Sequence, residues 1–325
     1  MKRRKFLETA AFAGATASIY PMGCEHSGGM IYRTLGKSGI KVSLLGFGSH
    51  LSKENKSNSK ERDRQIKEGL DRGINFFDIY EHGYEQFEPM AKSLASHNND
   101  VVISLVTIAS RNNIHYRFKN IHEEVEGALK IFKRDHIDCY RVVNKVDRDA
   151  DVLFRFKEQG KVRAVGIVAH YEEDAIKALE ERDFDFVMLP YNFHHNWGGA
   201  SALGTTYDLL MPLLKKNNIG IIAMKPMGSV DMIKLARDNN IIGPNAHGIP
   251  VPPAMLRYIF ENPYIATAIP TMNSVDEVQM NYTAVERPAL DDADRDVLVT
   301  LSKIAFETKS AYLSPHYQFL ERWTV

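Results

Sequence analysis

The sequence predicts an α/β fold, a (β/α)8 TIM barrel with an N-terminal β-hairpin, from three observations. Short apolar runs alternate with amphipathic helical patterns from Ile31 onward. These runs lack strict alternation of apolar and polar residues, as in parallel strands buried on both faces. Eight of them are present, the number that closes such a barrel. A doubly wound sheet is the alternative, and the absence of a glycine-rich phosphate loop after any run disfavours it.

The elements are expected in a regular order along the chain. A hairpin is predicted from residues 31–35 and 40–42, joined by the sequence GKSG. The barrel strands are predicted at residues 43–48, 75–78, 101–107, 137–143, 164–168, 186–190, 220–224 and 266–269. Helical patterns between them include residues 64–70, 121–133, 172–181, 207–216 and 253–261. Pro252 and Pro253 fit a helix start, and Gly160 fits a helix end.

The first 28 residues are assigned to an export leader. They begin with a basic run, continue with an alanine-rich apolar stretch and end in small residues. Arg3 and Arg4, followed by KFL, resemble a twin-arginine signal, which predicts the export machinery as a partner and a periplasmic location. Residues 15–17 offer an A-x-A cleavage site, and Cys24 follows a weak lipobox that predicts a lipid anchor. A basic start to an ordinary cytosolic protein is the alternative.

Residues 29–325 are expected to form one domain, the barrel with a C-terminal tail. The charge is balanced, with 41 Lys and Arg against 41 Asp and Glu, so nothing suggests nucleic acid as a partner. The two cysteines, Cys24 and Cys139, do not make a disulfide framework. No apolar run is long enough to span a bilayer as a mature helix. The expected partner is a small-molecule substrate, and a membrane is reached only through a lipid on Cys24.

Several segments, in order and spacing, resemble the aldo-keto reductase family from about Tyr32 to Ala305. YRTLGKSGIKVSLLGFGS is similar to the family's hairpin and first strand, and GLDRGINFFD is similar to its second unit. RDHIDCYRVVNKVD, GKVRAVGI and NNIGIIAMKPMG resemble the fourth, fifth and seventh strands, and AIPTMNSVDEVQMN resembles the cofactor segment. The resemblance implies hydride transfer between NADP or NAD and a carbonyl or hydroxyl group.

The catalytic residues that the resemblance implies are only partly present. The family uses a tyrosine as proton donor, a lysine with an aspartate that lower the pKa of this phenol, and a histidine that orients the carbonyl. Asp78 matches the aspartate, whereas Val106 occupies the lysine position. Asn144, or Val143 if the strand is regular, occupies the histidine position. The predicted catalytic residues are Asp78, Tyr84, Asn144 and His82.

Other residues compete for these roles. Tyr84 stands one residue after the position of the family's tyrosine, and Tyr80 is the competing proton donor. Lys145 and Lys225, near the ends of the fourth and seventh strands, are candidates to reach inward in place of the missing lysine. The alternative for both lysines is a solvated position on the rim.

The cofactor pocket that the resemblance implies keeps its outline but loses several contacts. Residues 168–170 (VAH) replace a Ser-Asn pair, and Met188 replaces a Gln. Tyr191 is expected to stack on a nicotinamide ring. Asn273 stands where a basic residue pairs with the 2′-phosphate, which weakens any preference for NADP over NAD. The predicted cofactor-binding residues are Tyr191, Pro270, Thr271, Asn273, Ser274 and Asn281.

Histidines and aromatic residues after the strands suggest three functions. Five histidines directly follow predicted strand ends: His50, His82, His170, His194 and His195. They are candidates for pocket walls, for acid–base groups or for a metal site, although no metal ligand is assigned. Phe193 and Trp197 suit the apolar face of a sugar. The first hypothesis is an aldo-keto reductase-like oxidoreductase acting on a small polar, sugar-like substrate. The alternatives are a catalytically inactive ligand-binding barrel (a pseudoenzyme) and a histidine-based enzyme on the same scaffold.

Overall fold

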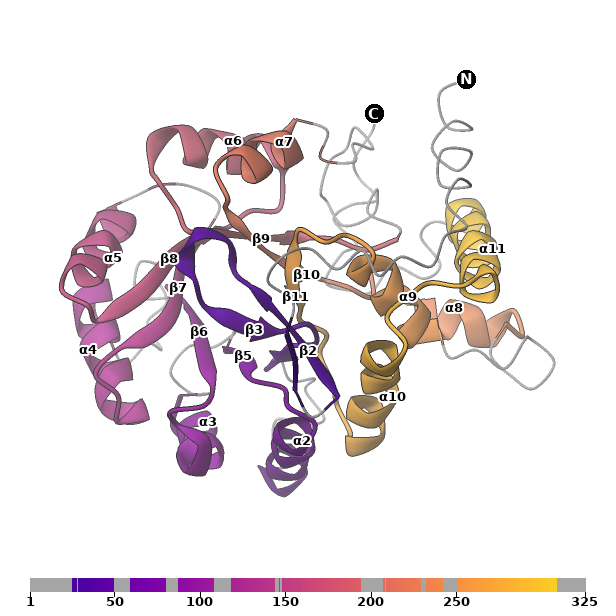
Figure 1. Ribbon diagram of the computed structural model, residues 1–325, viewed down its shortest axis with the longest axis horizontal. Helices are drawn as coiled ribbons and strands as arrows, with labels where there is room; N and C mark the ends of the chain where they lie inside the picture. The colour runs from indigo at the N-terminus through magenta and orange to yellow at the C-terminus, as the bar shows by residue number, and fades with distance from the viewer. Residues whose placement is uncertain are drawn as a thin grey trace.

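The structure is a computed structural model, and it confirms the predicted barrel. It describes residues 25–27, 29–49, 59–79, 87–107, 118–143, 146, 148–193, 207, 209–228, 232–241 and 251–308. Within these residues, strands β4 to β11 form one eight-stranded sheet in chain order, with helices around its outside (Figure 1). Neighbouring strands are parallel, so the C-terminal ends of all of them meet at one end of the barrel.

The barrel strands coincide closely with the apolar runs of the sequence. They are β4 (Phe47–Gly48), β5 (Phe76–Ile79), β6 (Val102–Val106), β7 (Ile137–Val143), β8 (Val162–Val168), β9 (Phe186–Pro190), β10 (Gly220–Met224) and β11 (Ile265–Ala268). The runs at 137–143, 186–190 and 220–224 match their strands at both ends. The first strand is shorter than predicted because Ser43 pairs with Tyr32 in a separate N-terminal sheet.

The helices lie between the strands as predicted, and several of their boundaries differ from the prediction. They are α2 (Ser59–Asp71), α3 (Phe87–Leu94), α4 (Ile121–Phe132), α5 (Arg148–Glu158), α6 (Glu172–Glu181), α7 (Leu210–Lys216), α8 (Met232–Asp238), α9 (Val251–Phe260), α10 (Val275–Glu286) and α11 (Asp292–Thr308), with short 3-10 turns at Gly36–Ser38 and Ala95–His97. The helix predicted at residues 207–216 begins at Leu210. Tyr207 lies outside it because its backbone is left-handed (φ 55°) and its buried hydroxyl donates to the Pro190 carbonyl.

The barrel closes between its last and first strands. The Ala268 N–H donates to the Leu44 carbonyl at 3.0 Å, and the Gly46 N–H donates back to the Ala268 carbonyl at 2.8 Å. The Gly48 N–H donates to the Pro270 carbonyl at 3.1 Å. Two parallel bridges along the same seam complete the pairing. The first barrel strand is thereby placed beside the predicted cofactor segment.

The predicted hairpin belongs to a three-stranded antiparallel sheet made of β1 (Glu25–Ser27), β2 (Met30–Thr34) and β3 (Lys41–Ser43). Strand β1 pairs with β2, so Glu25–Ser27, which lie among the first 28 residues, take part in this sheet. The rest of the predicted leader, with Arg3, Arg4 and Cys24, lies outside the described residues.

The hairpin covers the N-terminal end of the barrel and crosses the centre of the ring in Figure 1. Its turn docks on the start of β10, where the Lys37 N–H donates to the Asn218 carbonyl at 2.6 Å. Gly36 has φ 50°, and a Cβ there would lie 2.2 Å from the Gly220 nitrogen, so only glycine fits this close approach. The hairpin packs on this end of the barrel, and TIM barrels hold their active sites at the other end.

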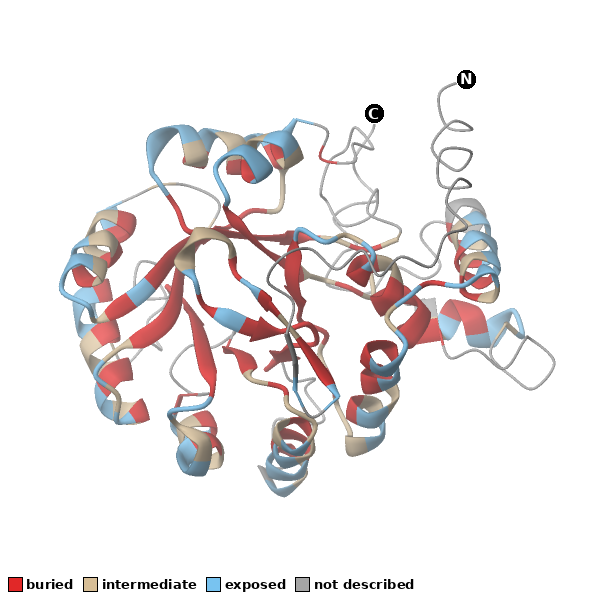
Figure 2. Ribbon diagram, in the orientation of Figure 1, coloured by how far each residue is buried: buried red, intermediate tan, exposed pale blue. Residues whose placement is uncertain are grey.

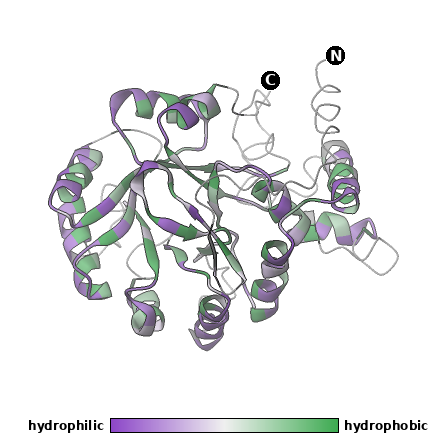
Figure 3. Cartoon of the chain, viewed as in Figure 1, coloured by the Kyte–Doolittle hydropathy of each residue, from purple (hydrophilic) through white to green (hydrophobic). Residues whose placement is uncertain are grey.

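Two apolar layers hold the barrel together (Figures 2 and 3). The larger layer lies between the strands and the helices. The smaller one, here called the interior cluster, fills the barrel with alternate side chains of the strands and with Leu35, Ile40 and Val42 of the hairpin. A third cluster joins α8, α9 and α11. Among the described helices, none has the length and hydropathy to cross a membrane.

Candidate functional site

Asp78, the predicted catalytic aspartate, lies at the C-terminal end of β5, the end at which TIM barrels hold their active sites. It has the same strand face as Phe76, a member of the interior cluster, so its carboxylate points into the barrel. Tyr84, His82, Tyr80 and Asn144 lie outside the described residues, and their roles remain predictions.

A buried arginine and a serine hold the Asp78 carboxylate. Arg141 Nη1 lies 2.7 Å from Asp78 Oδ1, and Arg141 Nη2 donates to Oδ2 at 3.1 Å. The Ser104 hydroxyl donates to Oδ1 at 2.9 Å and accepts from Arg141 Nη1 at 2.8 Å. Asp78 is 3% exposed, and Arg141 is not exposed at all. The result is a closed triangle of charge-assisted hydrogen bonds inside the barrel.

Arg141 is a site residue that the sequence reasoning missed. It stands in the middle of the predicted strand IDCYRVV, on the same face as the interior residue Cys139. A charged residue inside an apolar run that is buried on both faces requires a partner of opposite charge. That signal was present in the sequence, but it did not identify Asp78 as the partner.

Burial sets the electrostatics of the triangle. Loss of hydration raises the pKa of Asp78 above its ordinary value, and the Arg141 guanidinium and the Ser104 hydroxyl oppose this rise. An arginine holds its proton throughout the working range of proteins, so Arg141 acts as a fixed charge and not as a proton donor.

Apolar side chains occupy the positions where the family resemblance expected polar groups. Val106, at the lysine position, is buried in the interior cluster. Val168 and Met188, in place of the groups that hold the nicotinamide amide, belong to the same cluster, and Val143 packs against it. Among the described residues, this end of the barrel is therefore largely aliphatic around a single buried ion pair.

The predicted cofactor segment follows β11 and leads into α10. Pro270 and Thr271 lie against Gly48 at the barrel seam. Ser274 is the N-cap of α10, and its hydroxyl accepts from the Glu277 N–H at 3.1 Å. The structure thus places these predicted residues together at the C-terminal end of the barrel.

Carboxylates of the protein accept hydrogen bonds from backbone N–H groups at the start of α10. Glu277 Oε2 accepts from the Asn273 N–H at 2.7 Å, and Glu61 Oε1 of α2 accepts from the Val275 N–H at 3.3 Å. Asp276 adds a third acid in the same turn. These acids favour positive charge nearby and disfavour an added phosphate.

Two buried side chains beside this segment carry polar atoms without hydrogen-bond partners. Asn281 of α10 is 3% exposed, and its Oδ1 has no hydrogen-bond partner. Arg62 of α2 donates from Nη1 to the Met272 carbonyl at 3.3 Å, whereas its Nε and Nη2 have none. Burial lowers the pKa of Arg62 to about 10. Because such groups are costly when unsatisfied, a ligand here has both an acceptor and a positive charge to use.

Tyr191 is not presented to the barrel interior. Its ring stacks with Tyr207 and Tyr258 at centroid distances of 6.4 and 6.3 Å, and its hydroxyl accepts from Asn262 Nδ2 at 3.2 Å. The ring packs against the outer apolar layer. Its nicotinamide-stacking role remains a prediction, and this position gives it no support.

Lys225 follows β10 directly, at the same end of the barrel as Asp78. Its backbone is left-handed (φ 53°), and its carbonyl accepts from Asn192 Nδ2 at 3.1 Å. The side chain is partly buried, and this burial lowers the pKa of the amine to about 8. Lys225 is therefore not a fully solvated rim lysine. Lys145, the other candidate, lies outside the described residues.

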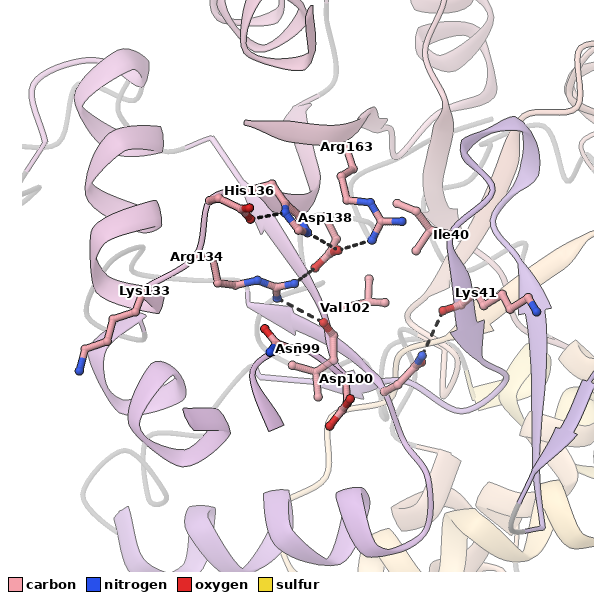
Figure 4. A pocket seen from close by; sticks show the side chains of 13 residues that line it. Ile40, Lys41, Asn99, Asp100, Val102, Lys133, Arg134, His136, Asp138 and Arg163 are labelled. Atoms are coloured by element: carbon pink, nitrogen blue, oxygen red, sulfur yellow. Dashed lines mark hydrogen bonds and ion pairs between the residues drawn. The ribbon is translucent and has the colours of Figure 1, made fainter. Parts of the chain in front are cut away.

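A cavity of about 680 Å³ lies at the opposite, N-terminal end of the barrel. In it, Arg134, His136 and Arg163 converge on Asp138 (Figure 4). Arg134 Nη2 and Arg163 Nη1 lie 3.0 and 2.8 Å from the Asp138 oxygens, and the Ile103 N–H donates to the carboxylate at 2.9 Å. The carboxylate is fully satisfied by the protein. This network belongs to the stabilising end of the barrel.

The histidine hypothesis is largely untested by the structure. His170 follows β8, as predicted, but His50, His82, His194 and His195 lie outside the described residues. Among the residues that are described, no three His, Cys, Asp or Glu side chains gather as metal ligands.

Comparison with known proteins establishes the family. The model of the Aldo/keto reductase family matches residues 44–302. The chain therefore belongs to the aldo/keto reductase family, whose members are oxidoreductases that act on small molecules. The sequence resemblance and the barrel agree with this assignment.

Two curated relatives and one solved structure show the extent of the similarity. L-galactose dehydrogenase of Arabidopsis thaliana is 22% identical over 307 residues, 86% of this chain and 95% of the relative. Aldo-keto reductase YhdN of Bacillus subtilis (strain 168) is 27% identical over 192 residues, 50% and 58% of the two chains. The holo form of aldo-keto reductase AKR11C1 from Bacillus halodurans superposes with a TM-score of 0.65 at 20% identity, covering 89% and 99%. At that identity, the solved structure supports the fold alone.

Proposed function

We propose that the protein is an oxidoreductase that transfers hydride between NAD and a carbonyl or hydroxyl group of a small polar, sugar-like substrate. Family membership supports the reaction class. The name of the Arabidopsis relative, L-galactose dehydrogenase, supports a sugar-like substrate. The structural observation that carries the proposal is the buried Asp78–Arg141 pair at the C-terminal end of the barrel.

The residues around α10 fit a dinucleotide. The unpartnered Oδ1 of Asn281 is an acceptor for the exocyclic amine of an adenine, and Arg62 places positive charge beside the same segment. The carboxylates of Glu277 and Glu61 suit a ribose hydroxyl, which donates, and repel a 2′-phosphate. These contacts support NAD over NADP, in the direction that Asn273 already suggested.

A bound nicotinamide would supply or accept the hydride, and the chain is proposed to provide charge and proton transfer. The Asp78–Arg141–Ser104 triangle is proposed to supply fixed charge near the reacting centre, where charge develops on the substrate oxygen. Tyr84 or His82 is proposed to move the proton, and Asn144 to orient the substrate oxygen. These three assignments rest on the family resemblance.

A second candidate function is a ligand-binding barrel without catalysis. It is favoured by the aliphatic side chains of Val106, Val168 and Met188, where the family's polar groups are expected. None of these side chains can donate a proton or hold an amide. The two candidates differ in one measurable property, namely whether a bound cofactor is reduced by substrate.

The deciding experiment measures cofactor content and turnover on the same sample of full-length, folded protein. After denaturation, released NAD is sought by absorbance and mass, and binding of NAD and NADP to cofactor-free protein is measured calorimetrically. L-galactose oxidation is followed at the absorbance of NADH, and reduction of 4-nitrobenzaldehyde by NADH is the generic probe. We expect bound NAD and turnover of at least one probe. Binding without turnover would support the second candidate, and no binding would overturn the first.

We also propose that the protein is exported through its Arg3-Arg4 leader. The basic run and the small-residue cleavage site support export, and Cys24 supports lipid attachment. Replacing both arginines with lysine is expected to retain the protein in the cytoplasm of a bacterial host. Mass spectrometry of the mature N-terminus distinguishes cleavage after residue 17 from a lipid on Cys24, and an intact Met1 in the wild type would contradict export.

A further inference from the structure

We propose that Arg141 takes over, from the adjacent strand, the cationic role for which the sequence leaves no lysine, and that it acts as a positioning residue for the reaction. The inference rests on the proposed function. It begins with the strand register, in which the Cα atoms of Val106 and Arg141 are direct partners in the β6–β7 ladder. The positive charge of Arg141 is therefore attached to the chain one strand away from position 106, where the family's lysine is expected.

The side chain of Arg141 is long enough to span the width of one strand and to reach the Asp78 carboxylate. Asp78 pairs with Ser104 in the β5–β6 ladder, so β6 separates the acid from its cation. Ser104 is short and hydroxylated, and its Oγ bonds both groups, which lets the guanidinium pass across β6 to Asp78. A longer side chain at Ser104 would fill this path.

On the β8 side, the ladder neighbour of Arg141 offers no side chain that could bind the guanidinium. Its ladder partner in β8 is Gly166, which has no side chain. The space above Gly166 is taken by the ring of Phe186, whose atoms would lie 2.4 Å from a Cβ at that position. Apolar packing on the β8 side and a carboxylate on the β5 side direct the guanidinium toward Asp78.

The exchange of lysine for arginine changes the chemistry in a predictable way. Lysine is a compact ammonium group that can lose its proton, whereas the planar guanidinium forms two parallel bonds to a carboxylate and stays charged. Arg141 therefore supplies a constant charge to the site and takes no part in proton transfer. The pH dependence of the reaction reports the proton donor and not the cation.

The test moves the positive charge from position 141 to position 106, where the family's lysine is expected. The variants are R141M, which removes the cation, R141K, which keeps one, and V106K/R141M, which returns a cation from β6. The double variant D78N/R141M is the matched control, because it removes both charges and leaves no buried charge unpaired. Initial rates are measured with NADH and 4-nitrobenzaldehyde and with NAD and L-galactose, from pH 6 to 10, and NAD binding is measured by calorimetry.

We expect R141M to lose kcat on the order of 10²-fold while its Kd for NAD stays within about threefold. R141K is expected to keep activity within about tenfold of the wild type. V106K/R141M should regain at least tenfold over R141M and show a second alkaline limb, in addition to that of the proton donor, because its lysine titrates. D78N/R141M should fold stably and remain as inactive as R141M.

The outcomes that contradict the inference are separate from those that contradict the function. If R141M kept the kcat and the pH profile of the wild type, or if D78N/R141M were fully active, the proposed role of Arg141 would be overturned. The proposed oxidoreductase function would not be affected by either result. Should R141M fail to fold, an unchanged pH profile in V106K/R141M would overturn the role of Arg141 instead. No turnover of either probe by the wild type would overturn both proposals together.

Discussion

The two ends of the barrel each contain a buried aspartate held by arginine, and they differ in redundancy. At the N-terminal end, Asp138 is held by Arg134, by Arg163 and by the Ile103 backbone N–H, beside a wide cavity. At the C-terminal end, a single arginine, Arg141, balances the charge of Asp78, and both side chains are buried. A network with several partners tolerates the loss of one, whereas a single enclosed pair does not. The comparison separates an end at which several groups hold one carboxylate from an end that depends on a single buried ion pair.

The largest expected effect comes from breaking the single pair. R141M leaves the Asp78 carboxylate buried without its counter-charge, and it should lower the free energy of unfolding by about 3–5 kcal/mol. Urea unfolding at pH 7 measures the change. D78N/R141M should recover most of the loss, because neither charge then remains. Equal instability of the single and the double variant would show that packing, and not charge, dominates at this end.

The corresponding change at the redundant end should cost less. R134M removes one of two arginines from Asp138, and Arg163 and the Ile103 N–H remain. We expect a loss of about 2 kcal/mol in the same urea experiment. R163M is the matched control with a partly solvated side chain, 47% exposed, and should cost less than about 1 kcal/mol. Losses for R134M as large as those for R141M would remove the distinction between the two ends.

A third change probes the partly buried amine at the C-terminal end. The pKa of Lys225 is lowered to about 8, so below that pH the folded state carries a charge that burial disfavours. Between about pH 8 and 10.5 the folded protein binds fewer protons than the unfolded chain, and stability therefore rises with pH in this window. K225M should raise the free energy of unfolding by about 1–2 kcal/mol at pH 7, and the gain should vanish above about pH 10.5.

Urea unfolding of the wild type and K225M at pH 7 and pH 10.5 tests this sign. A loss of stability in K225M at pH 7 would mean that contacts of the lysine outweigh the burial of its charge. An accompanying loss of NAD affinity would add a binding role for the amine.

The smallest expected change alters cofactor choice and sharpens the contrast between the two ends. N273R/E277Q replaces an amide and an acid at the start of α10 with a cation and an amide. The ratio of the Kd values for NAD and NADP should shift toward NADP by about tenfold, or about 1.4 kcal/mol. Calorimetry measures both constants, and R163M is the control, since it should leave both unchanged. If the ratio of the two Kd values did not change in N273R/E277Q, the 2′-position of the cofactor's ribose would have to lie elsewhere.

The sequence anticipated the barrel well because its signal is periodic and local. The runs at 137–143, 186–190 and 220–224 became strands with the same ends, since an apolar stretch of that length, flanked by turns, has few other ways to be buried. Boundaries that depend on tertiary contacts were less accurate. Tyr207 interrupts its predicted helix to bond Pro190, and Ser43 leaves the first strand to pair with Tyr32.

The candidate site was predicted in part. Asp78, Ser274 and Asn281 were found because they fall in segments whose order resembles a family. Arg141 was missed because its role depends on Asp78, which lies 63 residues away in the chain. The sequence pattern also could not predict the position of Tyr191. The direction of a side chain that follows a strand depends on its packing partners, which here are Tyr207 and Tyr258.

The sequence by itself determined the fold class, the strand order and the loss of the family's lysine. The fold class and the strand order follow from composition and periodicity along the chain, and the loss of the lysine follows from the family resemblance. Only the tertiary structure decided where the missing charge went. A strand register brings Val106 and Arg141 side by side, and a short serine lets the guanidinium cross to Asp78. Ion pairs between strands depend on distances in space, and those distances exist only once the barrel has closed.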